Sequence, residues 1–257
     1  MSKKKLLSAG CSLIYGAELS DSLDYHGRSN ASLKTWPALL ADHFNYDYFT
    51  CSLCGVSNQG IVRHVIDVCE RYEFDLLIVQ WTFFARYELR FNKKHDHFNE
   101  PSHYSNLSPW MCKYFDVPKN WSKEKNQELH EVFNNLPSGV KKGVDFWFDE
   151  IDCYDTAIYN YLKCTTELAT YLKWKNIPFV FACAETEPTQ QEIASWNDTS
   201  IDSLYKIHKS MPFVNFNDKG FYHWALEEKF PFGIDHPKDQ AHAAGFNLIL
   251  DQINNLL

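Results

Sequence analysis

A serine near the start of the chain and a histidine near its end are the residues best suited to covalent chemistry. Ser12 follows Gly10 and Cys11 where a short apolar run stops, and His236 lies between Asp235 and a proline. A serine hydroxyl becomes a strong nucleophile when a histidine takes its proton, and the reaction also needs a group that orients the histidine and donors for the oxyanion. The two residues therefore predict nucleophilic catalysis, provided that the fold brings them together. The alternative is that each one only caps a helix or closes a turn.

Strand and helix patterns alternate along the chain, and this alternation decides where Ser12 lies. Apolar runs predict strands at 5–9, 46–52, 75–80, 178–182 and 213–216, and helical spacing predicts helices at 36–44, 57–69, 151–175 and 241–257, the second of them capped by Ser57 or Asn58. The run at 75–80 is continuous, as in strands that a parallel sheet buries on both faces. We predict a three-layer α/β/α sandwich with a mostly parallel, flavodoxin-like sheet. Ser12 then follows the carboxyl end of the first strand, where open sheets of this kind bind ligands.

Residues 88–150 interrupt the alternation. They are rich in His, Asn, Lys, Trp, Pro and Phe and show little periodicity. A stretch of this length is long for a plain connection between two elements. We predict one domain over 1–257 with an insertion at about 88–150 on the catalytic side, as a lid or a substrate wall. The alternative is a surface excursion with no role in the site.

Composition and charge exclude several classes of protein. The chain has 257 residues, 45% of them hydrophobic, and a formal net charge of −8. This acidic balance, without a basic stripe, argues against nucleic-acid binding. No apolar stretch reaches the ~20 residues that span a membrane, so we expect no membrane partner. The apolar run after Lys3–Lys5 is too short for a signal peptide, and we therefore expect a cytoplasmic protein.

The cysteines and histidines give no metal signature. The eight cysteines fit a reducing compartment, and most of them lie in apolar segments as small buried residues. Cys51 and Cys54 have the spacing of a metal or redox pair, but no second such pair and no paired histidines accompany them. His95, His97 and His103 have spacings that a metal could use, and solvated loop histidines are the favoured interpretation. We predict no cofactor and no metal.

Three segments resemble the sequence blocks of one enzyme family. Gly10-Cys11-Ser12-Leu13 resembles the first block of the SGNH (GDSL-type) hydrolases, with Cys where the family usually has Asp. The segment 51–58 resembles the second block, whose glycine amide donates to the oxyanion, and 235–242 resembles the fifth block, in which His-Pro opens the last helix. The resemblance implies Ser12 as nucleophile, His236 as general base, and the amides of Ser12 and Gly55 in the oxyanion hole. The pattern as a whole is similar to a divergent branch found among bacterial and phage proteins.

Two features of that family are displaced in this chain. The third block usually reads Gly-x-Asn-Asp, and Thr82 stands where the asparagine would be. Thr82, Gln80 or Asn58 can supply the missing oxyanion donor, and we favour Asn58. The family spaces its catalytic Asp three residues before the histidine, and that position is Gly233. Asp235 is then the candidate acid, and a Ser–His dyad or a backbone carbonyl partner are the alternatives.

Three residues after the third predicted strand are candidates for substrate binding. Trp81 would form a cleft wall or a core ring, and Thr82 would face the site. Arg86 carries a guanidinium that suits an anionic group of the substrate. The alternative for Arg86 is an ordinary ion pair with Glu88.

These observations together predict a serine esterase or O-acyl hydrolase. The substrate would be a small-molecule or carbohydrate ester, and no cofactor is required. An acyltransferase with the same site is one alternative, because the chemistry up to the acyl-enzyme is shared. A non-catalytic binding or structural module that keeps the fold is the other. A fluorophosphonate probe separates an enzyme of either kind from a non-catalytic module, since only an activated serine is labelled.

Overall fold

Four parallel strands form the central sheet, in the order β2-β1-β3-β6. The computed structural model describes residues 3–22, 30–97, 100–107 and 138–256, and in 89–97, 100–107 and 138–140 it describes the backbone alone. The strands are β1 (Lys5–Ala9), β2 (Asp47–Thr50), β3 (Leu76–Trp81) and β6 (Phe179–Cys183). All four were predicted from apolar runs. Every residue of β3 is buried, as its continuous apolar sequence predicts for a strand covered on both faces.

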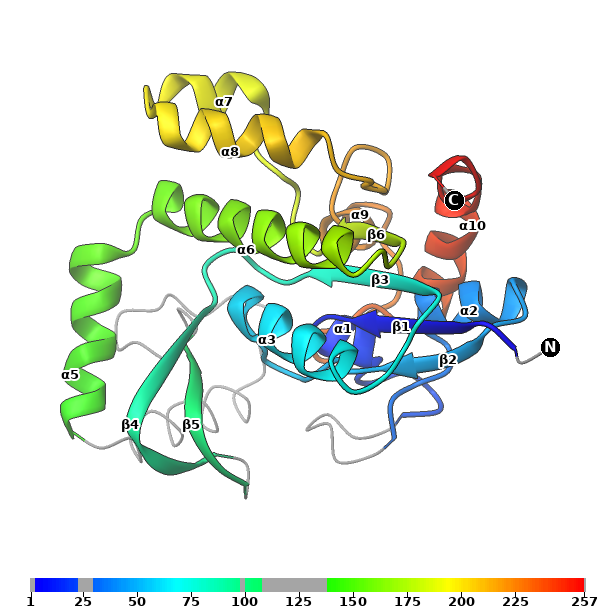
Figure 1. Cartoon of the computed structure of the whole chain (residues 1–257), viewed down its shortest axis with the longest axis horizontal. Helices are drawn as coiled ribbons and strands as arrows, with labels where there is room; N and C mark the ends of the chain where they lie inside the picture. Colours follow the sequence, from blue (N-terminus) through cyan, green and yellow to red (C-terminus); the bar gives the residue numbers. More distant parts are fainter. Residues whose placement is uncertain (1–2, 23–29, 98–99, 108–137, 257) are drawn as a thin grey trace.

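The helices that cover the sheet follow from its strand order. They are α2 (Trp36–His43), α3 (Asn58–Cys69), α6 (Tyr154–Trp174) and α10 (Asp239–Leu256). The chain moves one way across the sheet from β1 to β2 and the other way from β2 to β3. Right-handed crossovers therefore put α2 on one face and α3 on the opposite face. Consistent with this, α3 packs against α6 and α2 packs against α10 (Figure 1). The predicted three-layer α/β/α sandwich is confirmed.

The reversal of direction between β1 and β3 marks a place for chemistry. In open α/β sheets, ligands bind beyond the carboxyl ends of the strands at such a switch point. The chain leaves β1 there through Gly10 and enters the short helix α1 (Ser12–Tyr15). Ser12 therefore begins the first element beyond the switch point, as predicted.

The chain between β3 and α6 leaves the parallel sheet. An antiparallel hairpin of β4 (Tyr87–His97) and β5 (Glu100–Leu107) is followed by α5 (Ser138–Phe146) and a π-helical turn, η2 (Trp147–Ile151). Figure 1 shows the hairpin and α5 to one side of the sheet. Neither strand was predicted, and the role of 88–150 as a lid or wall stays a prediction. His95 and His97 lie on β4 and His103 on β5, and their side chains are outside the described residues.

Three further helices were not predicted. They are α7 (Gln190–Ser195), α8 (Thr199–Lys209), which packs on α6, and α9 (Phe221–Glu227). The predicted strand at 213–216 is reduced to one parallel bridge between Phe181 and Phe213. Within the described ranges, no helix combines the length and the apolar character needed to cross a membrane. The cysteines whose side chains are described are free thiols, and Cys11, Cys69, Cys164 and Cys183 are buried.

Candidate active site

The turn that carries Ser12 depends on a glycine. An added Cβ on Gly10 would lie 2.7 Å from Ile14 Cγ1 and 2.9 Å from the Gln80 carbonyl oxygen. Atoms do not approach that closely, so a side chain at this position would push β1 and β3 apart. The close approach sets Ser12 at the start of α1, where it keeps 8% of its surface exposed. Glycine is therefore the residue that this turn requires.

His236 reaches Ser12 from the other end of the chain. A tight turn, in which the Gly233 N–H donates to the His236 carbonyl at 2.8 Å, precedes α10 and holds the imidazole over α1. His236 Nε2 lies 2.8 Å from Ser12 Oγ. The structure therefore brings the two predicted residues into direct hydrogen-bonding contact across 224 positions of sequence.

The carboxylate behind His236 belongs to Glu18. Glu18 Oε2 lies 2.7 Å from His236 Nδ1. Burial raises the pKa of Glu18, but the hydrogen bonds from His236 and the Ile234 N–H outweigh it and hold the pKa below its ordinary 4.5. An ionised carboxylate only accepts hydrogen bonds, so Nδ1 carries the proton. His236 Nε2 then accepts the hydrogen bond from the Ser12 hydroxyl, which is the arrangement a general base needs.

Asp235 was the predicted acid, and the structure gives the place at Nδ1 to Glu18 instead. In the tight turn the Asp235 backbone N–H donates to Glu18 Oε2 at 3.0 Å. Adjacent residues do not readily share one hydrogen-bonding direction, so the residue next to His236 is poorly placed to orient its ring. Glu18 was missed because it lies in a loop without periodicity. The signal that points to it is Gly233, which leaves the histidine segment without the acid that the family pattern requires.

The loop after β2 brings Gly55 and Asn58 to the same edge of the sheet. The Leu53 N–H donates to the Gly10 carbonyl at 3.1 Å, which ties this loop to the nucleophile turn. Gly55 has a φ of 76°, a left-handed conformation that favours glycine. Asn58 is 2% exposed, and its Oδ1 accepts from the Thr82 N–H at 2.9 Å. In the described part of the chain, Asn58 Nδ2 is buried and has no hydrogen-bond partner.

Asn58 and Gln80, the other amide considered, both have a buried donor without a described partner, and it is their position that distinguishes them. A buried polar group without a partner is costly, and such groups in native structures call for an explanation. Gln80 Oε1 accepts from the Trp36 indole at 2.8 Å, within the core beneath α2. Gln80 Nε2 is also buried without a described partner, yet its side chain is fixed on the side of Trp36. Asn58, the first residue of α3, instead contacts Thr82, which directly follows the end of β3.

The three substrate-binding candidates have different environments. Trp81 is fully buried and packs edge-on against Tyr161 and Phe181, so the structure does not support contact with a substrate. It is the last residue of β3, and helices cover both faces of that strand. Thr82 is also fully buried, and its Oγ1 accepts from Arg86 Nη1 at 2.8 Å. Its side chain holds Arg86 rather than facing a ligand.

Arg86 is buried beside the nucleophile turn. Its guanidinium lies 4.7 Å from the centre of the Phe83 ring, and it interacts with the Cys11 thiol. Burial lowers the pKa of Arg86, and the nearby Cys11 and Glu185 oppose that effect. The alternative ion pair with Glu88 is wrong.

Glu88 pairs with Arg63 of α3 in a two-pronged contact. Arg63 Nη2 lies 2.7 Å from Glu88 Oε1, and Arg63 Nε donates to Oε2 at 3.1 Å. This ion pair joins the start of β4 to α3. The guanidinium of Arg86 contacts Thr82 and Cys11 instead.

A second histidine, His242, lies beneath the site. It is 1% exposed, and its Nδ1 accepts from the Trp36 N–H at 3.3 Å. Burial lowers the pKa of His242 to about 3, and of the two nearby charges Asp239 raises the pKa while His236 lowers it further. His242 is therefore neutral at ordinary pH and serves as a structural acceptor for the first turn of α2.

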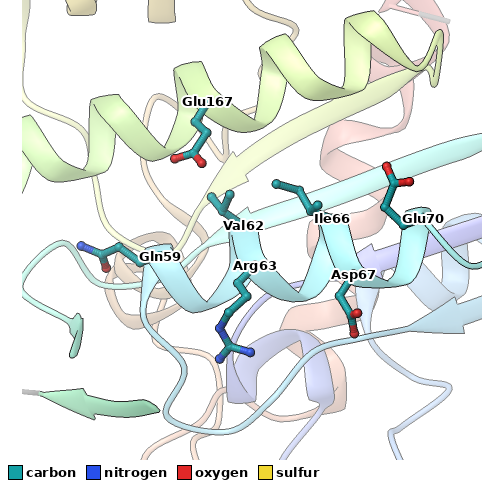
Figure 2. A pocket seen from close by; sticks show the side chains of 7 residues that line it. All are labelled: Gln59, Val62, Arg63, Ile66, Asp67, Glu70 and Glu167. Atoms are coloured by element: carbon teal, nitrogen blue, oxygen red, sulfur yellow. The ribbon is translucent and has the colours of Figure 1, made fainter. Parts of the chain in front are cut away.

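One groove on the described surface lies away from the predicted site residues. Within the described ranges, no three His, Cys, Asp or Glu side chains are grouped so that they could hold a metal. A groove of about 560 Å³ lies between α3 and α6. Its lining residues are Gln59, Val62, Arg63, Ile66, Asp67, Glu70 and Glu167. Figure 2 shows Val62 and Ile66 on the side of α3 that faces α6. None of the predicted site residues lines this groove.

Comparison with solved structures supports the fold. No protein-family model and no curated protein sequence matches the chain. The crystal structure of TesA matches 99% of this chain and 100% of its own, with a TM-score of 0.50 and 10% identity. A carbohydrate esterase family 2 enzyme with a carbohydrate-binding domain, from Corynascus thermopiles (Myceliophthora fergusii), matches 99% of this chain and 67% of its own, with a TM-score of 0.50 and 12% identity.

A member of the lipolytic protein G-D-S-L family from Veillonella parvula also matches, over 98% of this chain and 100% of its own, with a TM-score of 0.46 and 11% identity. The matches to TesA and to the carbohydrate esterase family 2 enzyme agree with the three-layer fold that the alternation of strands and helices predicts.

Proposed function

We propose that this protein is a serine esterase in which Ser12 is the nucleophile and His236 the general base. One observation carries the proposal: Ser12 Oγ and His236 Nε2 lie 2.8 Å apart at the switch point of the sheet. A carboxylate holds the opposite ring nitrogen, so the imidazole has the tautomer that accepts the serine proton. A helix cap or turn does not require this linear arrangement of three groups.

The reaction runs through an acyl-enzyme. His236 Nε2 takes the proton of Ser12 Oγ as the oxygen attacks the ester carbonyl, and a tetrahedral oxyanion forms. The intermediate collapses when the C–O bond to the alcohol breaks, and His236 returns the proton to the leaving alkoxide. Water then attacks the acyl-Ser12 ester with His236 as base again, which releases the acid and restores the serine. No cofactor takes part.

The oxyanion would be held by two backbone amides and one side chain. The Ser12 N–H belongs to the first turn of α1, where N–H groups have no intrahelical acceptor. Gly55 provides the second amide, and Asn58 Nδ2 provides the third donor in place of the missing third-block asparagine. The Thr82 N–H fixes the orientation of Asn58 by occupying its Oδ1. A donor held in place before the reaction costs no reorganisation when charge develops.

The substrate proposed is a small-molecule or carbohydrate ester. Arg86 is the residue proposed to contact it, because its guanidinium lies beside Cys11 at the nucleophile turn. Thr82 and Phe83 hold that guanidinium in place. A planar guanidinium donates to carboxylate and phosphate groups in pairs, so an ester that carries such a group is the first to test.

Hydrolysis of short-chain p-nitrophenyl esters tests the proposal. The wild type is compared with Ser12→Ala and His236→Ala, and Ser210→Ala, at the exposed C-cap of α8, serves as the matched serine control. We expect the first two variants to lose about 10³-fold or more of kcat/KM and the control to keep its activity. The proposal is contradicted if the wild type hydrolyses none of a panel of esters, or if Ser12→Ala and His236→Ala are as active as the wild type.

A further inference from the structure

Position 233 of the histidine segment has no room for an acid while the Glu18 carboxylate keeps its place. Gly233 stands three residues before His236, where the family that these sequence blocks resemble has its catalytic Asp. An added Cβ on Gly233 would lie 2.7 Å from Glu18 Oε1 and 2.8 Å from Glu18 Cδ. Both distances are shorter than real Cβ contacts. A side chain at 233 and the present position of the Glu18 carboxylate therefore exclude each other.

The Glu18 carboxylate is held by consecutive backbone amides of the same turn. Oε1 accepts from the Ile234 N–H at 2.7 Å, and Oε2 accepts from the Asp235 and His236 N–H groups at 3.0 Å each. Successive N–H groups that converge in a turn form a concave anion site. Oε2 also faces His236 Nδ1 at 2.7 Å, so one carboxylate fixes both the backbone and the ring of the base.

The backbone of Glu18 is adapted to this contact. Its φ is 65°, a left-handed conformation that residues other than glycine adopt uncommonly. Lys238 Nζ donates to the Glu18 carbonyl at 2.6 Å, and Ser20 Oγ donates to Asp239 at 2.5 Å. The loop after α1 is thus fixed to the segment around His236 at several points. An uncommon conformation persists where its surroundings determine it in this way, and such positions cluster at functional sites.

We infer that Glu18 is the acid of this active site, moved from the histidine segment to the loop after the nucleophile, and that Gly233 is the complementary change that makes room for it. The inference rests on the proposed function. Glu18 does not touch the substrate and acts through His236 as a positioning residue. It keeps the proton on Nδ1 and stabilises the imidazolium that forms when Ser12 loses its proton.

The first test compares Glu18→Gln with Asp235→Asn, using p-nitrophenyl acetate. Glutamine keeps the shape of Glu18, but its amide can donate to Nδ1 and favour the wrong tautomer. We expect kcat to fall by about 10³–10⁴-fold in Glu18→Gln, with KM within about threefold of the wild type. The acidic limb of the pH profile of kcat/KM also moves to lower pH, because the imidazolium loses its carboxylate. Asp235→Asn keeps kcat within about threefold.

A second pair of variants keeps the test open if Glu18→Gln does not fold. Gly233→Asp alone is expected to lose activity, because its Cβ meets the Glu18 carboxylate. Glu18→Ala/Gly233→Asp removes the contact with the Glu18 carboxylate and returns a carboxylate to the same space. The remaining close atom, Lys238 Nζ at 2.8 Å from the added Cβ, is the end of a flexible side chain that can move away. We expect the double variant to recover at least tenfold in kcat over Glu18→Ala. A folded double variant that is no more active than Glu18→Ala overturns the inference.

The outcomes separate the inference from the proposed function. If Ser12→Ala is inactive while Glu18→Gln keeps full activity, Glu18 is not the acid and the esterase proposal stands. If Asp235→Asn loses as much activity as Glu18→Gln, the acid has been assigned to the wrong residue. A wild type without esterase activity contradicts both.

Discussion

Replacement of Asn58 by alanine tests how this chain stabilises an oxyanion without the third-block asparagine. The side chain has two separable jobs. Its Nδ2 is a buried donor without a described partner, and its Oδ1 accepts from the Thr82 N–H at 2.9 Å. Loss of one oxyanion donor costs about 10²–10³ in kcat, or ~2.7–4 kcal/mol of transition-state stabilisation. Loss of the acceptor strands a buried N–H and costs about 1–3 kcal/mol of folding stability.

The assay must therefore measure catalysis and stability together. Initial rates with p-nitrophenyl acetate give kcat and KM, and urea unfolding gives the free energy of unfolding. We expect Asn58→Ala to lose 10²–10³-fold in kcat with KM nearly unchanged, because the hydrogen bond forms in the transition state and not in the bound ester. The unfolding free energy falls by about 1–3 kcal/mol.

Ser57→Ala is the matched control. Ser57 caps α3 one residue earlier, and its Oγ accepts from the Gly60 N–H at 3.1 Å. Loss of this cap costs about 1 kcal/mol of stability and is expected to leave kcat within about threefold. If Asn58→Ala folds and keeps kcat within threefold of the wild type, Asn58 is not an oxyanion donor and the reasoning from its orphaned amide is refuted.

Two further predictions concern the site and the core beneath it. The pKa of His242 is about 3 in the folded protein against an ordinary 6.5, so only the unfolded chain takes up this proton between those values, and stability falls as pH falls through that window. Protonation of His242 in the unfolded chain therefore lowers the free energy of unfolding by about 2 kcal/mol between pH 7 and pH 5. Urea unfolding at pH 7 and pH 5 should show a smaller decrease in His242→Asn than in the wild type. Gly55→Ala meets no atom within 4 Å but must adopt a φ of 76°; we expect a loss of about 1–2 kcal/mol in unfolding free energy and a lower kcat. Gly143→Ala in α5 has equal space and should instead be neutral or stabilising by up to about 1 kcal/mol, and equal stability changes in the two variants would contradict this account.

The sequence predicts the parallel sheet because its central strands are marked by their own residues. β3 opens with an uninterrupted apolar run from Leu76 to Val79, and burial on both faces is what such a run indicates. The hairpin of β4 and β5 was missed because Tyr87–His97 and Glu100–Leu107 are polar and pair with each other outside the main sheet. The apolar run at 213–216 was assigned a strand, yet it contributes a single bridge to Phe181.

The residues proposed for the site were predicted where a local motif marks them. Ser12, Gly55 and His236 each stand in a short block whose residue types have a physical reason at that position. Glu18 has no such block, and its position depends on a contact with His236 across 218 residues. Long-range contacts of this kind are set by the fold. The only local sign in the sequence is Gly233, which stands where the family pattern has an acid.

Trp81 was predicted to form a cleft wall or a core ring, and the structure shows it as a fully buried core ring. Its burial between Tyr161 and Phe181 follows from the position of β6 beside β3. The sequence alone does not place those two elements at that distance. The residue type at position 81 alone therefore could not decide between a cleft wall and a core ring.

The central claim, that Ser12 is an activated nucleophile, is tested most directly by a fluorophosphonate probe followed by peptide mass spectrometry. The account predicts one covalent adduct per chain, located on Ser12. It also predicts no adduct in Ser12→Ala and much slower labelling in His236→Ala, because the hydroxyl there has no base. An unlabelled wild-type protein, or an adduct on another serine that persists in Ser12→Ala, would contradict the account.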